Sequence, residues 1–239
     1  MTDTDTGTAI RTLLEKRRAV SARRSVLAAV SGIDGSGKGY ITGQLAAGLA
    51  SHGMKVASIN IDGWLNLPAR RFSATEPAKH FYEHAIRFRE MFDQLVLPLK
   101  AHRTHRLVAD FAEETATAYR PHGYQFDDVD IILLEGIFLL KRAHRAHFDM
   151  ALWVDCSFET ALERALRRGQ EGLPPDETIR AYETIYFPAQ RIHFVRDDPR
   201  RAADLIVAND PRLTAAGPSS GGRPPSVGGD GNAPAPGAA

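Results

Sequence analysis

Short apolar runs alternate along this chain with longer stretches in which apolar residues recur every three or four positions. Runs such as 25–30, Ser-Val-Leu-Ala-Ala-Val, are apolar on both faces and are typical of central strands in a parallel sheet. We expect strands at 25–30, 56–61, 105–109, 129–134, 150–154 and 204–208, and helices at 8–24, 38–52, 77–97, 157–169 and 176–193. This alternation predicts an α/β fold with a doubly wound parallel sheet flanked by helices.

The chain length and the distribution of apolar residues predict three parts. With 239 residues and 43% hydrophobic residues, the chain can bury a sizeable core in one domain, which we place at residues 25–210. Residues 1–24 precede it as an N-terminal helix. Residues 211–239 are rich in Pro and Gly, and the stretch from Gly217 to Ala239 has no aromatic residue, so we expect a disordered tail.

The overall charge excludes a strong general attraction to nucleic acid or to membranes. Lys and Arg number 30 and Asp and Glu number 29, for a net charge of +1. The single cysteine, Cys156, excludes an internal disulfide and fits a reducing compartment. No apolar run reaches membrane-spanning length, so we expect a cytoplasmic protein. The sequence leaves open whether the protein forms a homo-oligomer. We interpret the arginines at 17, 18, 23 and 24 as a solvated helix face rather than as part of a transit peptide.

The segment from Gly32 to Lys38 fits the phosphate-binding pattern G-x-x-x-x-G-K and lies between a predicted strand and a predicted helix. Its glycines allow consecutive N–H groups to point at phosphate oxygens, and Lys38 would reach the β- and γ-phosphates. A glycine-rich turn without a ligand is the alternative, which the strand–loop–helix context disfavours. The predicted nucleotide contacts are Gly32, Asp34, Gly35, Ser36, Gly37, Lys38, Gly39 and Tyr40.

Gly39 departs from the pattern, because a Ser or Thr whose hydroxyl binds Mg²⁺ normally occupies this position. The sequence therefore predicts a nucleotide triphosphate site that has lost one metal ligand. We expect ATP and Mg²⁺ as ligands, with the metal held less tightly than usual. Because of Gly39, an alternative also stays open: the protein binds a nucleotide but has lost catalytic activity.

Two acids follow predicted strands at the edge where ligands bind in a doubly wound sheet. Asp62 follows the strand 56–61 and could accept the proton of a substrate hydroxyl. Glu135 follows the strand 129–134 and could hold Mg²⁺. Asp62 could instead belong to an ordinary Asp-Gly turn, and Glu135 could cap the next segment. Beside a phosphate-binding loop, we favour the functional interpretation of both acids.

Arginines gather on the predicted helix 157–169, just before a segment rich in Gly and Pro, 169–175. Arginine suits a closing lid because its planar guanidinium can bind phosphate oxygens as their charge spreads in the transition state. We assign Arg164 and Arg168 to this role and interpret Arg167 as part of a solvated face.

These residues together resemble the uridine kinase/phosphoribulokinase family of P-loop kinases. The resemblance rests, in family order, on Gly32 to Lys38, Asp62, Asp110-Phe111, Leu134-Glu135-Gly136-Ile137, and the Arg-rich helix Thr160 to Arg168 with Ala203 to Val207. It implies a P-loop NTPase-type fold and ATP-dependent phosphorylation of a hydroxyl on a nucleoside or similar polar metabolite. It also implies that Asp62 is the base, that Glu135 is the metal-site acid, and that Lys38, Arg164 and Arg168 take part in catalysis.

The substrate pocket is expected to differ from that of a uridine kinase. The run Pro77-Ala78-Lys79-His80-Phe81 carries Lys79 where such kinases place an Asp. By position, the resemblance implies that Asp62, Lys79, His80, Asp110 and Phe111 contact the acceptor. A nucleoside monophosphate kinase of the thymidylate kinase type stays open as an alternative, in which Lys79, Arg70 and Arg71 would bind the acceptor phosphate.

Overall fold

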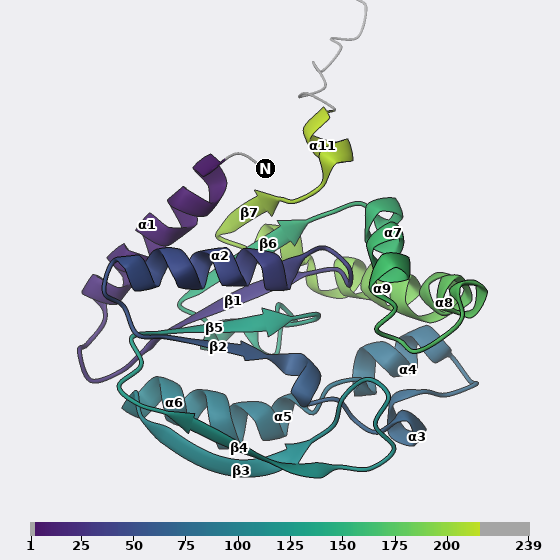
Figure 1. Ribbon diagram of the computed structural model, residues 1–239, viewed down its shortest axis with the longest axis horizontal. Helices are drawn as coiled ribbons and strands as arrows, with labels where there is room; N and C mark the ends of the chain where they lie inside the picture. Colours follow the sequence, from purple (N-terminus) through teal and green to yellow (C-terminus); the bar gives the residue numbers. More distant parts are fainter. Residues whose placement is uncertain (1–2, 216–239) are drawn as a thin grey trace, which may run out of the picture.

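Five parallel strands form the central sheet of the computed structural model, which describes residues 3–215 (Figure 1). Their order across the sheet is β2-β5-β1-β6-β7, so β5 lies between β2 and β1, and β6 lies on the other side of β1. The strands are β1 Val26–Gly32, β2 Val56–Asn60, β5 Ile131–Gly136, β6 Met150–Asp155 and β7 Leu205–Ala208. The predicted doubly wound α/β fold is confirmed.

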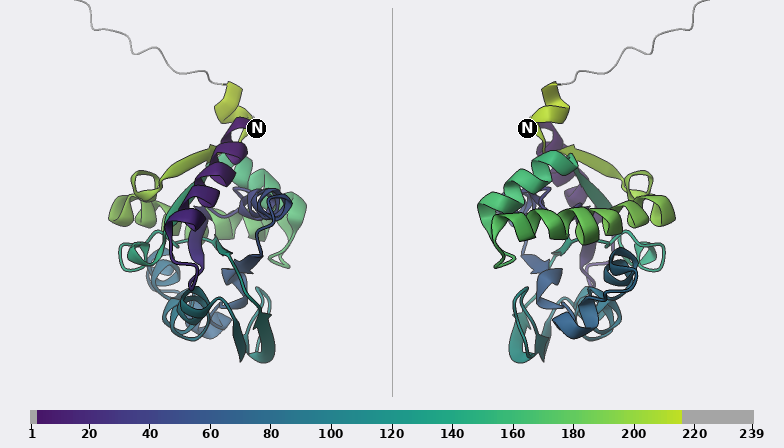
Figure 2. Two further views of the ribbon diagram at one scale, coloured as in Figure 1. Left: turned by 90° about the vertical axis from the view of Figure 1, so that its left-hand side faces the viewer. Right: turned by 90° about the vertical axis from the view of Figure 1, so that its right-hand side faces the viewer.

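Helices α1 (Asp3–Ala19) and α2 (Lys38–Ser51) cover one face of this sheet. Alternate residues of β1, Val26, Ala28 and Val30, pack against them, because successive side chains of a strand point to opposite faces. Helix α2 contributes the residues at the expected four-residue spacing, Ile41, Leu45 and Leu49, all fully buried. In Figure 2, the left-hand view looks onto α1 and the right-hand view looks onto α7 and α9.

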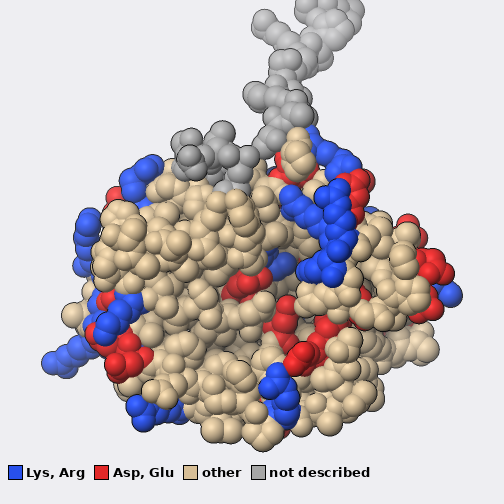
Figure 3. Space-filling model, in the orientation of Figure 1, with Lys and Arg blue, Asp and Glu red and all other residues tan. Residues whose placement is uncertain are grey.

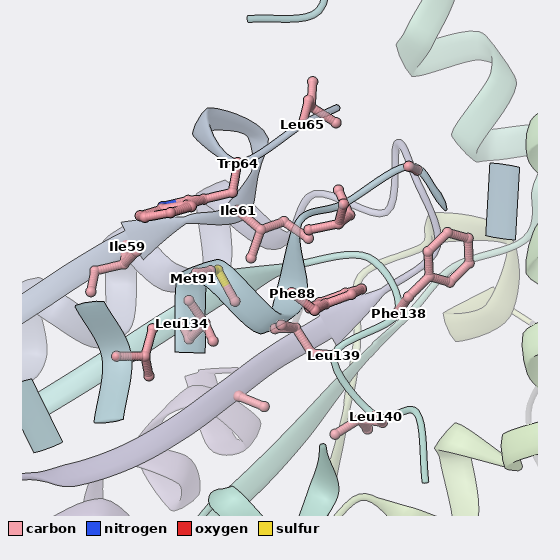
Figure 4. Close-up of a cluster of buried hydrophobic side chains, with 14 of the residues drawn as sticks. Ile59, Ile61, Trp64, Leu65, Phe88, Met91, Leu134, Phe138, Leu139 and Leu140 are labelled. Atoms are coloured by element: carbon pink, nitrogen blue, oxygen red, sulfur yellow. The ribbon is translucent and has the colours of Figure 1, made fainter. Parts of the chain in front are cut away.

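A larger apolar cluster covers the opposite face of the sheet (Figure 4). Leu27 and Ala29 of β1 enter this cluster, which also contains the fully buried Trp64, Met91 and Phe138. Because both faces of the sheet are buried, its central strands β1, β5 and β6 are buried along almost their whole length, whereas the edge strand β2 alternates. The helices that contribute to this cluster are α4 Pro77–His84, α5 Phe88–Met91, α6 Leu97–His102, α7 Phe158–Arg168 and α9 Phe187–Asp197.

The remaining helical segments are short. They are η1 Ile61–Gly63, α3 Pro68–Arg71, η2 Phe92–Val96, η3 Arg145–His147, α8 Pro175–Ala181, η4 Tyr182–Tyr186, α10 Pro199–Ala202 and α11 Pro211–Ala215. None of the helices in residues 3–215 combines the length and the apolar character needed to cross a membrane.

The predicted single helix 77–97 is wrong, because the chain leaves the helix at residues 85–87. The backbone N–H of Asn66 donates to the carbonyl of Ala85, and the N–H of Arg87 donates to the carbonyl of Trp64, both at 2.9 Å. These bonds join two segments some twenty residues apart in the sequence. The apolar periodicity of residues 77–97 does not reveal this pairing.

Two π-helical segments occur where a proline lies inside a long helix. Pro98 and Pro188 each follow the end of a π segment by two residues. Proline has no N–H, and its ring clashes with the carbonyl four residues earlier, so the helix widens at this point. For Pro98 that carbonyl belongs to Gln94, and it accepts a hydrogen bond from the His105 ring at 2.8 Å instead.

Strand β3 (His105–Phe111) pairs antiparallel with β4 (Arg120–Phe126) in a ribbon that is separate from the main sheet. The sequence predicts β3 but not β4. Strand β4 contains Pro121 and Gly123 and alternates between exposed and half-buried positions, so it lacks an apolar run.

The expectation of a solvated arginine face before residue 25 is wrong for two residues. Helix α1 ends at Ala19 rather than 24, and Arg17 Nε lies 3.1 Å from Asp130 Oδ1 with its side chain only 13% exposed. Arg24 Nη1 lies 2.9 Å from Asp149 Oδ2. These ion pairs attach the N-terminal segment to the loops that precede β5 and β6.

The predicted disordered tail begins too early. Residues Pro211–Ala215 form α11, and Arg212 Nη2 lies 2.5 Å from Glu163 Oε1 of α7. The rest of the predicted tail, residues 216–239, lies outside the described residues.

Candidate active site

The phosphate-binding loop joins β1 to α2 and can be built only with glycine at two positions. Gly35 and Gly37 have φ values of 73° and 85°, in the left-handed region. A Cβ atom at Gly35 would lie 2.5 Å from the carbonyl oxygen of Ala161, and one at Gly37 would collide with Asn209 Nδ2. Helix α2 begins at Lys38, so its positive end lies next to the loop, as the sequence predicts.

Two side chains hold the loop from outside by binding its carbonyl groups. Asn209 Nδ2 donates to the Ser36 carbonyl at 2.7 Å, and Arg164 Nη1 donates to the same oxygen at 3.1 Å. Arg164 Nη2 also donates to the Asn209 carbonyl at 2.9 Å. Arg164 therefore lines the cavity and also supports the loop, which is a different position from the predicted lid. Asn209 was missed, and its only signal in the sequence is its place directly after β7.

The predicted acids meet the loop at one cavity of about 340 Å³. Asn60 of β2 pairs in register with Glu135 of β5, and Asn60 Oδ1 accepts a hydrogen bond from the Asp62 N–H at 2.8 Å. Asp62, Glu135 and Lys38 all line the cavity. Figure 3 shows acidic side chains gathered in the hollow at the centre of this face.

Burial shifts the pKa of both acids upward. It raises the pKa of Asp62, and the nearby charge of Asp34 raises it further, whereas Lys38 lowers it. Burial likewise raises the pKa of Glu135, and Lys38 opposes the shift. A carboxylate with a raised pKa is a better proton acceptor, which suits Asp62 for general base catalysis.

Glu135 is the side chain of this cavity that best fits a metal held mainly by phosphates. Its carboxylate oxygens lie beside Gly39, the position where a hydroxyl ligand is missing. Within residues 3–215, no group of three or more His, Cys, Asp or Glu side chains is arranged to hold a metal. Mg²⁺ typically keeps several waters and binds few carboxylates together with substrate phosphates, so a single carboxylate is compatible with it.

A network of polar side chains connects the loop with the segment between α7 and α8. Tyr182 donates from its hydroxyl to Asp34 Oδ2 at 2.5 Å, and the same hydroxyl lies 2.9 Å from Glu171 Oε1. Arg168 Nη2 lies 3.1 Å from Glu171 Oε1 and 3.6 Å from Asp34 Oδ1. Arg168 thus reaches the cavity from the predicted lid, whereas Arg167 is exposed, as expected.

Several predicted acceptor contacts do not line the cavity. Lys79 lies on the outer side of α4 and pairs with Glu76 at 2.9 Å, and the His80 ring donates to the Arg70 carbonyl at 3.0 Å. Their neighbour Phe81 faces the cavity instead, because α4 turns this apolar residue toward the core. Asp110 is exposed and lines a different hollow.

The other predicted contacts are divided between the cavity and its surroundings. Phe111 lines a hollow of the β3–β4 ribbon that also reaches Asp62. Tyr40 is 63% exposed, and its hydroxyl accepts a hydrogen bond from Gln44, outside the cavity. Gly32 lies behind the loop, where a Cβ atom would come within 2.6 Å of the Ser36 hydroxyl oxygen.

Glu114, Tyr186 and Gln190 of the cavity wall are among the residues that the sequence analysis missed. Glu114 lies in the loop between β3 and β4, where Arg71 Nη2 donates to its carbonyl at 2.6 Å and lies 3.4 Å from its Oε1. Burial raises the pKa of Glu114 to about 7, although Arg71 lowers it. Glu114 follows another glutamate in a polar segment, and nothing in that pattern distinguishes it.

No family model and no curated protein matches this sequence. Solved structures do match its fold. A protein described as a possible uridine kinase from Bacillus stearothermophilus has a TM-score of 0.64 at 22% identity, covering 83% of this chain and 96% of its own. A candidate fructose transport system kinase from a Silicibacter species has a TM-score of 0.59 at 18% identity, with 88% and 98% covered.

A third match, D-glycerate 3-kinase from Cryptococcus neoformans, has a TM-score of 0.55 at 14% identity and covers 80% of this chain and 88% of its own. The three matches cover most of this chain. At these identities the similarity establishes the fold. This chain has an α/β fold of the P-loop NTPase type.

Proposed function

We propose that this protein is a kinase that transfers the γ-phosphate of ATP to a hydroxyl group of a small polar metabolite. The observation that supports this most directly is that the phosphate loop, Asp62 and Glu135 all line one cavity. Phosphoryl transfer needs a cradle for the triphosphate, neutralisation of its charge and a group that orients the attacking hydroxyl. The cavity offers a candidate for each.

In the proposed reaction Asp62 accepts the proton of the acceptor hydroxyl as its oxygen attacks the γ-phosphorus. A bond from that oxygen to phosphorus forms, the bond from phosphorus to the bridging oxygen of the β-phosphate breaks, and ADP leaves. Lys38 and the N-terminal end of α2 stabilise the phosphate charge, and Arg168 can reach the same oxygens from the lid. Glu135 would hold Mg²⁺, which neutralises phosphate oxygens when it is bound.

The structure gives no support to the alternative of a nucleoside monophosphate kinase, because the residues expected to bind the acceptor phosphate lie elsewhere. Lys79 pairs with Glu76, Arg70 lines a separate hollow, and Arg71 is 1% exposed and bound to Glu114. Of the described residues, none of these three lines the cavity. We therefore favour an acceptor that carries no phosphate.

The test is the release of ADP from ATP in the presence of nucleosides, nucleotides, sugars and small vitamins, each assayed with and without Mg²⁺. We expect turnover that depends on one acceptor and falls by about 10²–10⁴-fold in Asp62→Asn. Tight ATP binding without turnover on any acceptor would instead support a nucleotide-binding protein that has lost catalysis. This outcome is tested because Gly39 lacks the hydroxyl that normally binds Mg²⁺.

A further inference from the structure

One wall of the cavity carries a buried amide with no partner among the described residues. Gln190 of α9 lines the cavity and is 1% exposed, yet neither its Nε2 nor its Oε1 forms a hydrogen bond with the described residues. An unpaired amide of this kind lowers stability, because it has lost its hydrogen bonds to water. Such a group is a candidate ligand contact when it faces a cavity.

Tyr186 lies one helical turn before Gln190 and also lines the cavity. Its hydroxyl forms no hydrogen bond within residues 3–215, although the ring itself packs 5.0 Å from the ring of Phe81. The cavity lining therefore combines an amide and a hydroxyl with the carboxyl group of Glu114. Its apolar surface comes from Leu65, Phe81 and Ile137.

The cations that line the cavity are already engaged by other groups. Lys38 Nζ donates to the Ile33 carbonyl at 2.9 Å, Arg164 binds the loop carbonyls, and Arg168 pairs with Asp34 and Glu171. No other Lys or Arg of the described chain lines the cavity, whereas Asp34, Asp62, Glu114, Glu135 and Glu171 all do. Arg71, whose Nε and Nη1 are buried without partners among the described residues, contacts Glu114 but does not line the cavity. An anionic group bound near Gln190 would lie among these acidic side chains, and every cation of the cavity lining is already hydrogen-bonded.

From these contacts we infer that the acceptor is an uncharged polyol and that the amide of Gln190 binds two of its hydroxyl groups. A hydroxyl both donates and accepts, so neighbouring hydroxyls can satisfy the NH₂ and the carbonyl of one amide together. Further hydroxyls can donate to Glu114, and the C–H face of the carbon skeleton can pack on Phe81. The inference rests on the proposed kinase function and narrows its substrate class.

The polyol could be a free sugar or sugar alcohol, or the ribose of a nucleoside, because both present vicinal hydroxyls. An acceptor panel separates these sources: ribose, ribitol, fructose, glycerol, uridine and cytidine, with uridine monophosphate and glycerate as anionic members. We expect the highest kcat/KM for an uncharged polyol. A best acceptor that is anionic overturns the inference and leaves the kinase proposal intact. Absence of ADP release with every compound overturns the kinase proposal, and the inference falls with it.

A second measurement tests the role of Gln190. Gln190→Met keeps the length of the side chain and removes both hydrogen-bonding groups, so the acceptor KM should rise about tenfold or more while the ATP KM is unchanged. Gln94→Met makes the same chemical change at an exposed position and should alter neither constant. An unchanged acceptor KM in a folded Gln190→Met protein contradicts the inference.

The competing explanation is that Gln190 is structural and binds a buried water together with His193, whose Nε2 is also buried and unpaired. Deoxy analogues of the best acceptor test its recognition in the unmodified protein, so this measurement does not depend on the folding of Gln190→Met. Removing a non-reacting hydroxyl should lower kcat/KM at least tenfold in the unmodified protein, and Gln190→Met should abolish this discrimination. If no single deoxy analogue loses more than twofold, the amide does not recognise the acceptor.

Discussion

Gly39 lies directly beside Glu135: a Cβ atom at Gly39 would stand 3.5 Å from Glu135 Oε2 and 3.8 Å from Oε1. These are ordinary van der Waals distances, so a side chain can be added at residue 39 without displacing the carboxylate. The position that lacks the hydroxyl ligand, Gly39, and the carboxylate of Glu135 are therefore neighbours in the cavity. Substitutions at these two residues can test the predicted metal site directly.

We predict that Gly39→Ser lowers the Mg²⁺ concentration needed for half-maximal turnover by several-fold. The serine hydroxyl would supply an oxygen next to Glu135, at the position where phosphate-binding loops normally provide one. A Mg²⁺ titration at fixed ATP measures the effect, with Gly39→Ala as the control for added bulk. Equal titration curves for the Ser and Ala variants would show that residue 39 has no role in metal binding.

Replacing Glu135 by Gln should have the opposite effect and raise the required Mg²⁺ concentration. Asp62 lines the same cavity and offers a second carboxylate to the metal. We therefore expect a shift of several-fold rather than complete loss. The same titration tests it, and a curve that coincides with that of the unmodified protein would exclude Glu135 from the metal site.

Lys38→Ala should abolish ATP binding and leave the fold intact. The lysine forms one hydrogen bond, to the Ile33 carbonyl, and its charge is needed by the triphosphate rather than by the core. Calorimetric titration with ATP measures binding, and thermal unfolding checks the fold. Lys55→Ala removes a lysine whose side chain is 57% exposed and should bind ATP normally. Unaltered ATP affinity in Lys38→Ala would show that this loop is not the nucleotide site.

Asp62→Asn should retain ATP binding and lose phosphoryl transfer by about 10²–10⁴-fold, the usual cost of removing a general base. The amide preserves the shape of the side chain and cannot take up the proton. Single-turnover rates with the best acceptor measure the loss, and Asp93→Asn, a change on the exposed side of η2, is the matched control. A rate within a few-fold of the unmodified protein would make Asp62 a structural residue.

Glu114 should make stability fall as the pH rises from about 4.5 to about 7. The pKa is 4.5 for an ordinary glutamate and about 7 in the folded protein, so in this range the folded state keeps a proton that the unfolded chain releases. The loss should be roughly 1–3 kcal/mol, since the side chain is 25% exposed. Urea unfolding of Glu114→Gln between pH 5 and 8 should show a flatter dependence. Parallel profiles would mean that Glu114 titrates normally.

The local order of this protein could be read from its sequence. A run that is apolar on both faces, followed by Gly32 to Lys38 and an amphipathic helix, specifies the strand, the loop and the helix, because each depends on residues close together in the chain. Asp62 and Glu135 could also be predicted, because each directly follows a strand and parallel strands end at one edge of the sheet. The break at residues 85–87 was not found, because it depends on hydrogen bonds to residues 64–66.

The other wall of the cavity was decided by tertiary packing. Tyr186 and Gln190 lie on a helix whose sequence does not distinguish core-facing from cavity-facing positions, and Glu114 becomes buried only when its loop meets Arg71. Lys79 and His80 were placed by analogy of position, and the rotation of α4 puts Phe81 in the cavity instead. The sequence by itself thus determined the half of the cavity formed by the loop from Gly32 to Lys38, where the structure follows local backbone geometry. Only the folded structure decided the half formed by Glu114, Tyr186 and Gln190, where distant segments pack to form the wall.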